Sequence, residues 1–140
     1  LLAIMEAIMK YTYTAIFTPT EDGTELYARI PDLPGCVTTG DSIEDAIEQI
    51  TDAASGWLVV AEDKSLPIPS ATPQAALEHE PTDVLSLIQV DTLAYRAATD
   101  TRAVRKNVSL PSWMADLADK RGINCSQVLQ EGLLSRLSVG

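Results

Sequence analysis

Three polar side chains near the carboxyl end of the chain are spaced so that they could contact nucleic-acid bases. Arg105, Asn107 and Ser109 alternate with other residues, so they share one face of an extended segment. Arginine can donate two hydrogen bonds to guanine, asparagine can bridge adenine, and serine can contact either base. We therefore predict a β-strand over residues 104–110 whose polar face contacts DNA bases.

A second candidate contact lies at the start of a predicted helix. Asn124, Cys125 and Ser126 follow Gly122, and Gln127 stands at the capping-box distance from Asn124. A helix N-terminus has free N–H groups and the positive end of the helix dipole, and both attract phosphate. We expect Asn124, Cys125 and Ser126 to contact DNA phosphates.

Three short elements must position these side chains. After the strand, a helix begins at Pro111, where the missing N–H is tolerated, and ends at Gly122 before the helix that Asn124 caps. So short a segment cannot bury an adequate core alone, and a single strand leaves its backbone groups unpaired. Two copies that pair their strands antiparallel and interlock their helices solve both problems. We therefore predict that residues 102–140 form a homodimer whose two-stranded ribbon enters the DNA major groove.

The N-terminal part carries the pattern of a small domain with one sheet and one long helix. A helix begins at Ser42, with Asp45 at the capping-box distance, and a proline-rich crossing leads from it to the last strand. The predicted strands span residues 10–17, 25–30, 36–40 and 84–91, the helix 42–61, the crossing 65–83 and a further short helix 92–98. The order is β-β-β-α-β, with the helix covering one face of the sheet.

Residues suited to catalysis or metal binding are few. The chain has one histidine, His79, in the proline-rich crossing, and two cysteines, Cys36 and Cys125, in distant and unlike contexts. This set offers no His/Cys metal cluster, and neither a Ser-His-Asp nor a Cys-His arrangement is evident. We expect two reduced thiols in a cytoplasmic protein, and no catalytic site, metal site or cofactor.

Acidic residues are numerous, but their predicted positions do not converge. Glu44, Glu48 and Asp52 recur on the solvent face of the long helix. Two-metal nuclease chemistry needs several carboxylates at one point, so we do not expect a nuclease. A solvated helix face is the simplest explanation of these acids. The alternative is a docking surface for a basic partner, formed by Glu44, Asp45, Glu48 and Asp52.

Charge is distributed unevenly along the chain. Residues 1–100 hold four basic and seventeen acidic side chains, a net charge of −13, whereas residues 101–140 hold six basic and three acidic ones, a net charge of +3. The formal net charge of the whole chain is −10. An acidic body joined to a basic tail indicates two partners of opposite charge.

We expect neither a membrane span nor a secretory signal. No apolar run reaches the roughly 20 residues that a membrane-spanning helix needs. The apolar opening lacks the basic start and the small-residue cleavage site of a signal peptide. Because Met9 directly precedes the first predicted strand, we expect residues 1–8 to be an N-terminal extension outside the fold.

Two stretches resemble known families. The strand-Leu-Pro-helix-Gly-Ile-Asn-x-Ser-helix pattern of residues 104–137 resembles the ribbon-helix-helix repressors. It departs from them at Lys106, where such strands usually carry an inward apolar residue. Residues 30–46, with the sequence IPDLPGCVTTGDSIEDA, resemble the HicB antitoxin family, and the resemblance extends over nearly the whole chain from Met9.

The HicB resemblance implies a partial, catalytically inert RNase H-like fold for the N-terminal domain. It also implies a HicA-like toxin as partner, which is a small basic mRNA interferase with a double-stranded-RNA-binding-like fold and a catalytic histidine. Members of the family are expected to mask that toxin and to repress their own operon. The acids Glu44, Asp45, Glu48 and Asp52 then become the candidate toxin-binding residues.

We therefore predict an α+β protein with three parts. Residues 1–8 form the extension, residues 9–98 a HicB-like toxin-binding domain, and residues 102–140 a ribbon-helix-helix module for dimerisation and DNA binding. The predicted function is that of the antitoxin in a type II HicAB-like system. Two alternatives stay open: a ribbon-helix-helix repressor whose N-terminal domain senses a small ligand, and a stand-alone nuclease. The operator, the RNA preference of the toxin, the toxin-contacting surface and the choice between dimer and tetramer also stay open.

Overall fold

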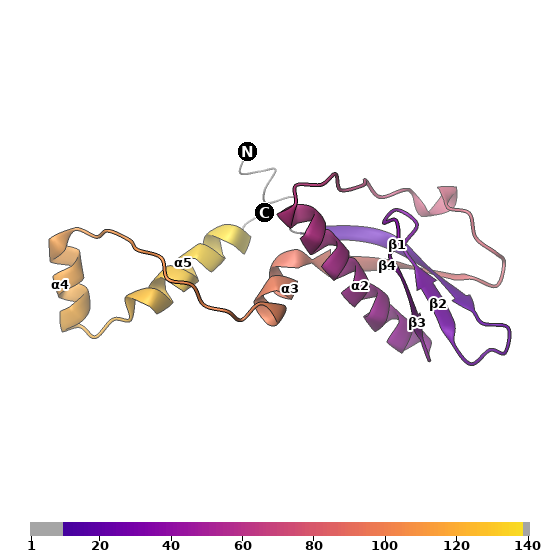
Figure 1. Cartoon of the computed structure of the whole chain (residues 1–140), viewed down its shortest axis with the longest axis horizontal. Helices are drawn as coiled ribbons and strands as arrows, with labels where there is room; N and C mark the ends of the chain where they lie inside the picture. The colour runs from indigo at the N-terminus through magenta and orange to yellow at the C-terminus, as the bar shows by residue number, and fades with distance from the viewer. Residues whose placement is uncertain (1–9, 139–140) are drawn as a thin grey trace.

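The computed structural model describes residues 10–138, so the expected extension, residues 1–8, lies outside the described residues. Figure 1 shows the described elements from the sheet to the C-terminal helices. They are β1 (Lys10–Pro19), β2 (Leu26–Arg29), β3 (Val37–Gly40), α2 (Ile43–Asp63), η1 (Gln74–Ala76), β4 (Val84–Asp91), α3 (Thr92–Thr99), α4 (Ser112–Lys120) and α5 (Cys125–Ser138). The predicted β-β-β-α-β order is confirmed, as are the short helix after β4 and the two C-terminal helices.

The strands form one antiparallel sheet in the order β3-β2-β1-β4. The first three strands make a meander, and β4 returns beside β1, where Lys10 lies opposite Asp91 and Phe17 opposite Val84. This arrangement leaves β3 and β4 at the two edges of the sheet. Helix α2 packs across one face (Figure 1).

Alternation along β1 decides which side chains meet the helix. Tyr13 and Phe17 point to the α2 side, where they are buried in one cluster with Ile50 and Leu58 of the helix. Burial of apolar surface contributes about 25 cal/mol per Å² to the stability of the fold. The packing of this apolar layer is therefore the main interaction that holds α2 on the sheet.

Local contacts fix the start of α2. The Ser42 hydroxyl accepts a hydrogen bond of 3.0 Å from the N–H of Asp45, and the Asp45 carboxylate accepts one of 3.0 Å from the N–H of Asp41. The return contact therefore reaches one residue further back than the capping box predicts. Gly40 lies so close to the first turn that a Cβ atom there would clash with the backbone of Ala46, so only glycine permits this approach.

The crossing between α2 and β4 is tied to the rest of the domain. The Tyr13 hydroxyl donates to the carbonyl oxygen of Pro69. The Asp32 carboxylate accepts from both the N–H and the hydroxyl of Thr72, at 2.9 and 2.5 Å. The crossing contains the short 3-10 helix η1. These contacts hold the proline-rich segment against the domain although it contains little regular structure.

Gly122 ends α4 as the sequence predicts. Its φ angle is +65°, in the left-handed region that favours glycine. The N–H of Gly122 donates to the carbonyl of Asp119, and the N–H of Ile123 donates to that of Ala118. This pair of bonds is a Schellman ending, which turns the chain toward α5.

The predicted strand over residues 104–110 is not formed by the single chain. Residues 100–111 contain neither helix nor strand, and the side chains of residues 101–111 are exposed. Within residues 10–138 the sheet consists of β1 to β4 alone, so this segment is not paired with it. Because a β-strand needs a partner for its N–H and C=O groups, the strand stays a prediction about two chains together.

Candidate functional site

The predicted base contacts lie on an open segment. Arg105, Asn107 and Ser109 are exposed, and none of them makes a hydrogen bond or ion pair with another described residue. The neighbouring Arg102 differs, because its guanidinium pairs with Asp100 at 2.9 Å. The polar groups of the three candidates are therefore available to a partner outside the chain.

The predicted phosphate contacts lie at the first turn of α5. The Asn124 side-chain oxygen accepts a hydrogen bond of 3.1 Å from the N–H of Gln127 and so caps the helix. Gln127 does not return the contact, because its side chain donates to Glu131 instead. The N–H groups of Cys125 and Ser126 lack partners within the helix, as in any first turn. They are thus free for phosphate, whereas the oxygen of Asn124 is already engaged.

The C-terminal segment exposes its apolar side chains to solvent. They belong to the open segment, to α4 and to α5, and include Trp113, which is 63% exposed. Among the described residues the large ones are Val104, Val108, Leu110, Trp113, Met114, Leu117, Ile123, Val128, Leu129, Leu133, Leu134 and Leu137. A monomeric soluble protein seldom exposes so many apolar side chains on one segment, so this set marks an interaction surface.

The acids of α2 do not all have the same role. Glu44, Glu48 and Asp52 are exposed and take part in none of the ion pairs between described residues. Asp45 is half-buried, and the hydrogen bond from the Asp41 N–H lowers the pKa of its carboxyl group. Asp45 therefore serves the start of the helix, and the exposed acidic face consists of the other three.

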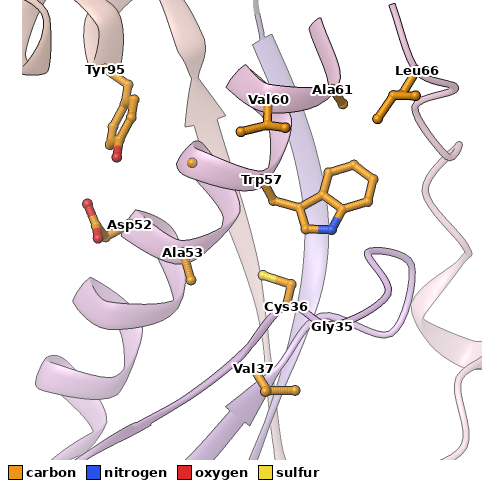
Figure 2. A pocket seen from close by; sticks show the side chains of 11 residues that line it. Gly35, Cys36, Val37, Asp52, Ala53, Trp57, Val60, Ala61, Leu66 and Tyr95 are labelled. Carbon is orange, nitrogen blue, oxygen red and sulfur yellow. The ribbon is translucent and has the colours of Figure 1, made fainter. Parts of the chain in front are cut away.

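An open groove of about 550 Å³ runs beside α2 (Figure 2). Its lining is mostly apolar and comes from the start of β3, from α2, from the chain after α2 and from α3. The lining residues are Gly35, Cys36, Val37, Asp52, Ala53, Gly56, Trp57, Val60, Ala61, Leu66 and Tyr95. Asp52 and Tyr95 lie at one end and Leu66 at the other (Figure 2). The groove is therefore an apolar surface with a carboxylate at one end.

Trp57 lies at the margin of the core. Its position on the apolar stripe of the helix predicts a core residue, but the side chain is only partly buried, packs at the margin of the core and lines the groove. Its indole N–H donates to the carbonyl oxygen of Pro34 at 2.9 Å. This bond fixes the ring against the connector that leads into β3.

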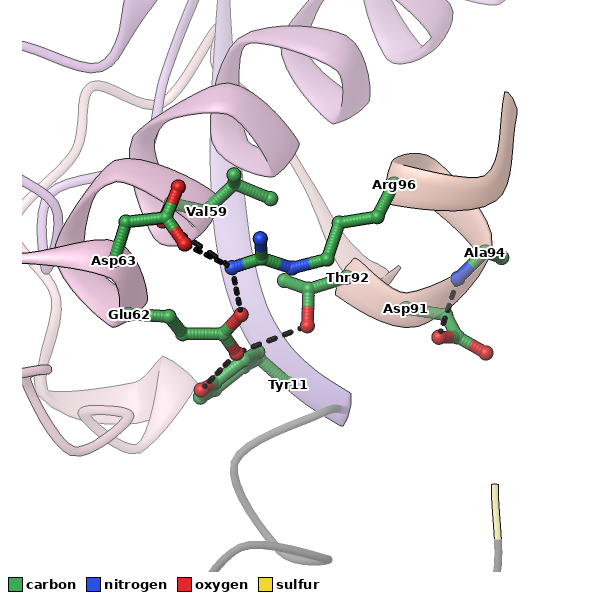
Figure 3. A network of polar contacts seen from close by, with 8 residues as sticks. All are labelled: Tyr11, Val59, Glu62, Asp63, Asp91, Thr92, Ala94 and Arg96. Carbon is green, nitrogen blue, oxygen red and sulfur yellow. Dashed lines mark hydrogen bonds and ion pairs between the residues drawn. The ribbon is translucent and has the colours of Figure 1, made fainter. Parts of the chain in front are cut away.

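A polar network joins β1, α2 and α3 (Figure 3). The Glu62 carboxylate accepts hydrogen bonds from Tyr11 at 2.8 Å, from Thr92 at 2.9 Å and from Arg96 at 3.0 Å. Arg96 also pairs with Asp63 at 2.9 Å. Burial, together with the bond to Glu62, raises the pKa of Tyr11 above its ordinary value. This network could not be predicted from the sequence, because its members lie 30 to 51 residues apart and share no local pattern.

The histidine, cysteine and acidic side chains of the described residues form no metal-binding cluster. No set of three His, Cys, Asp or Glu side chains within residues 10–138 is placed to hold a metal ion. His79 is exposed, with Nδ1 3.0 Å from the carbonyl oxygen of Glu80. Both thiols are free, and burial raises the pKa of Cys36. None of the helices in this range has the length and apolar character that a membrane crossing requires.

The chain is similar to known antitoxins. A family model described as HicB-like antitoxin of bacterial toxin-antitoxin system matches residues 13–138. The fold is similar to that of a chain in a toxin–antitoxin complex from Streptococcus pneumoniae, with 20% identity, a TM-score of 0.58, and coverage of 91% of this chain and 99% of that one. It is also similar to the Burkholderia pseudomallei antitoxin HicB, with 21% identity, a TM-score of 0.51, and coverage of 89% and 96%. Among curated proteins no sequence matches the chain.

Proposed function

Because the chain belongs to the family of HicB-like antitoxins of bacterial toxin–antitoxin systems, we propose that it neutralises an mRNA interferase toxin by direct binding and represses its own operon. The N-terminal domain, which we propose to be a partial RNase H-like fold, holds the toxin. Residues 102–140 form a ribbon-helix-helix dimer that binds operator DNA. Both activities are binding activities, and neither requires catalysis or a cofactor.

The exposed apolar surface of α4 and α5 is the main support for the proposal that the chain dimerises and binds operator DNA. Its side chains are exposed in the single chain, and the segment before it has unpaired backbone groups. A second copy of the same segment supplies what both features lack, namely an antiparallel partner strand and an apolar partner surface. The resulting ribbon carries Arg105, Asn107 and Ser109 from each chain on one face, which is the arrangement that direct contact with bases requires.

The proposal that the N-terminal domain binds a toxin is supported by its charge and by its fold. The toxin that the family implies is basic, and α2 carries six acids and no basic residue. Opposite charges speed the encounter of two proteins and disfavour wrong partners. The solved chain from Streptococcus pneumoniae, whose fold is similar, comes from a toxin–antitoxin complex.

Ligand sensing by the N-terminal domain has less support. A repressor that responds to a small molecule needs a cavity that surrounds most of the ligand. The apolar groove beside α2 is open along the surface instead, which suits a protein partner better than a small molecule.

Two experiments test the proposed function. The first asks whether the chain co-purifies with the basic protein encoded by the neighbouring reading frame and prevents that protein from cleaving mRNA. The second measures binding to DNA from upstream of the operon by electrophoretic mobility shift. Arg105→Ala should weaken the specific complex by about 1–3 kcal/mol, whereas Arg29→Ala, the same substitution on the sheet, should leave it unchanged. Equal binding by wild type and Arg105→Ala would show that this face does not contact bases.

A further inference from the structure

The groove beside α2 gathers exposed apolar side chains of the N-terminal domain. Val37, Val60 and Leu66 are 65%, 47% and 51% exposed, and all three line it together with the partly buried Trp57. They come from three separate parts of the chain, so the patch exists only in the folded domain. Apolar side chains around an aromatic anchor are the usual centre of a protein–protein interface.

Gly56 is one of the residues that line this groove. It lies in the interior of α2, where glycine is less favourable than alanine by about a factor of five in helix propensity. A Cβ atom at Gly56 would fit, since its nearest neighbour would be the Tyr95 hydroxyl at 3.7 Å. Packing inside the domain therefore does not require glycine here. Its absent side chain instead leaves room for close approach from outside the domain.

The charge around the groove selects the chemistry of the occupant. Asp52 lines the groove, Glu48 precedes it by one helical turn, and neither has a basic partner among the described residues. The nearest cation of α3, Arg96, is paired with Glu62 and Asp63. A surface that is apolar with an unpaired acidic end complements a segment that presents apolar side chains beside lysine or arginine.

The opposite face of the sheet does not offer the same chemistry. It also exposes apolar side chains, among them Leu87, which is 63% exposed. The strand register, however, places Lys10 and Arg29 on that face, because both alternate with the residues that point to α2. Val37 is the strand partner of Arg29, so the groove borders this basic face at Val37. A basic partner therefore meets cations on the opposite face and beside Val37, and unpaired acids on the α2 side of the groove.

We propose that the toxin binds in the groove between α2, the start of β3 and α3, with apolar side chains against Trp57 and basic side chains on Asp52 and Glu48. This inference rests on the proposed toxin-binding function, and it specifies the surface that carries it. The occupant is a basic amphipathic segment of the toxin. A small molecule and a second copy of this chain are the competing occupants, and the test distinguishes them.

The test compares toxin binding by two groove variants, one that fills the groove and one that reverses its charge, with binding by matched control variants. The probe is the purified product of the neighbouring reading frame, and its affinity for the full chain is measured by isothermal titration calorimetry. Gly56→Gln fills the groove without removing a core contact, and Asp52→Lys reverses the charge. Leu87→Gln on the opposite face and Glu80→Lys in the exposed crossing are the controls. Gly56→Gln and Asp52→Lys should each weaken binding at least tenfold, and both controls should bind within a factor of two of wild type.

Folding and other occupants are separated by parallel measurements. The thermal midpoint of Gly56→Gln should equal or exceed that of wild type, because glutamine favours the helix over glycine. If wild type binds the probe and both groove variants bind it equally well, the toxin lies elsewhere and the inference is overturned. The same holds if the groove variants change only the oligomeric state in sedimentation, which would assign the groove to a second copy. If wild type itself does not bind the probe, the proposed toxin-binding function fails as well.

Discussion

Replacing Glu62 by alanine should lower the free energy of unfolding by about 2–4 kcal/mol. Its side chain is only 5% exposed and accepts three hydrogen bonds, from Tyr11, Thr92 and Arg96. A hydrogen bond to a charged group contributes about 1.5–3 kcal/mol. The full sum is not lost, because the side chain of Arg96 is 33% exposed and keeps its pairing with Asp63. The two hydroxyl contacts alone would sum to about 3–6 kcal/mol. The expected loss is smaller, because Tyr11 is only partly buried and its hydroxyl can bond to water once the carboxylate is removed.

Urea unfolding followed by far-ultraviolet circular dichroism measures this change. Asp63→Ala is the matched control, since it removes a neighbouring carboxylate from the same arginine at a position where the side chain is 58% exposed. An exposed ion pair contributes about 0–1 kcal/mol, so the control should stay within that range. Glu62→Gln, which keeps an acceptor oxygen but loses the charge, should fall between the two. If Glu62→Ala and Asp63→Ala cost the same, the buried network does not stabilise the contact between α2 and α3, and the reasoning is refuted.

Three further predictions concern pH, capping and assembly. The pKa of Tyr11 is raised in the folded chain, so the unfolded chain loses the hydroxyl proton first as the pH rises. The contribution of this proton to the free energy of unfolding is therefore complete below about pH 10 and declines as the pH rises further. Tyr11→Phe should flatten this decline when urea midpoints are measured against pH. Ser42→Ala should cost about 1 kcal/mol in the same assay through loss of the N-cap of α2, whereas Ser70→Ala in the exposed crossing should cost nothing measurable. Leu133→Lys should convert the proposed dimer to monomers in analytical ultracentrifugation and abolish the proposed operator shift, because it places a charge on the apolar surface of α5. Gln130→Lys on the same helix should leave both intact. An unchanged oligomeric state in Leu133→Lys would show that Leu133 does not lie in the interface.

Most of the fold could be predicted because its signals are local. The strand predicted over residues 84–91 has those bounds in the structure, since alternating apolar residues and the flanking turns lie within one stretch of chain. The start of α2 at Ser42 and the end of α4 at Gly122 were predicted for the same reason, because a cap is made by residues a few positions apart. The capping-box rule was one residue off for the carboxylate of Asp45, which accepts from the N–H of Asp41 instead of that of Ser42.

The candidate site was predicted only in part. The exposed acidic face of α2 follows from helical spacing, so Glu44, Glu48 and Asp52 could be placed from the sequence. The groove and the position of Trp57 could not be predicted from the sequence. Both depend on how the connector before β3 and helix α3 pack against α2. Gly56 is a signal within the sequence itself, since a glycine retained inside a helix usually has a packing or functional reason.

By itself, the sequence determined the elements, their order, their caps and the separation of an acidic body from a basic tail, because each depends on residues near one another in the chain. Only the tertiary structure decided the strand order β3-β2-β1-β4, the burial of Glu62 among partners 30 to 51 residues away, and the groove built from three separate segments. The physical reason is that these features arise from contacts between distant parts of the chain, whose formation depends on packing and desolvation in three dimensions. The strand predicted over residues 104–110 is not decided by the tertiary structure of one chain either, since its backbone hydrogen bonds require a second chain.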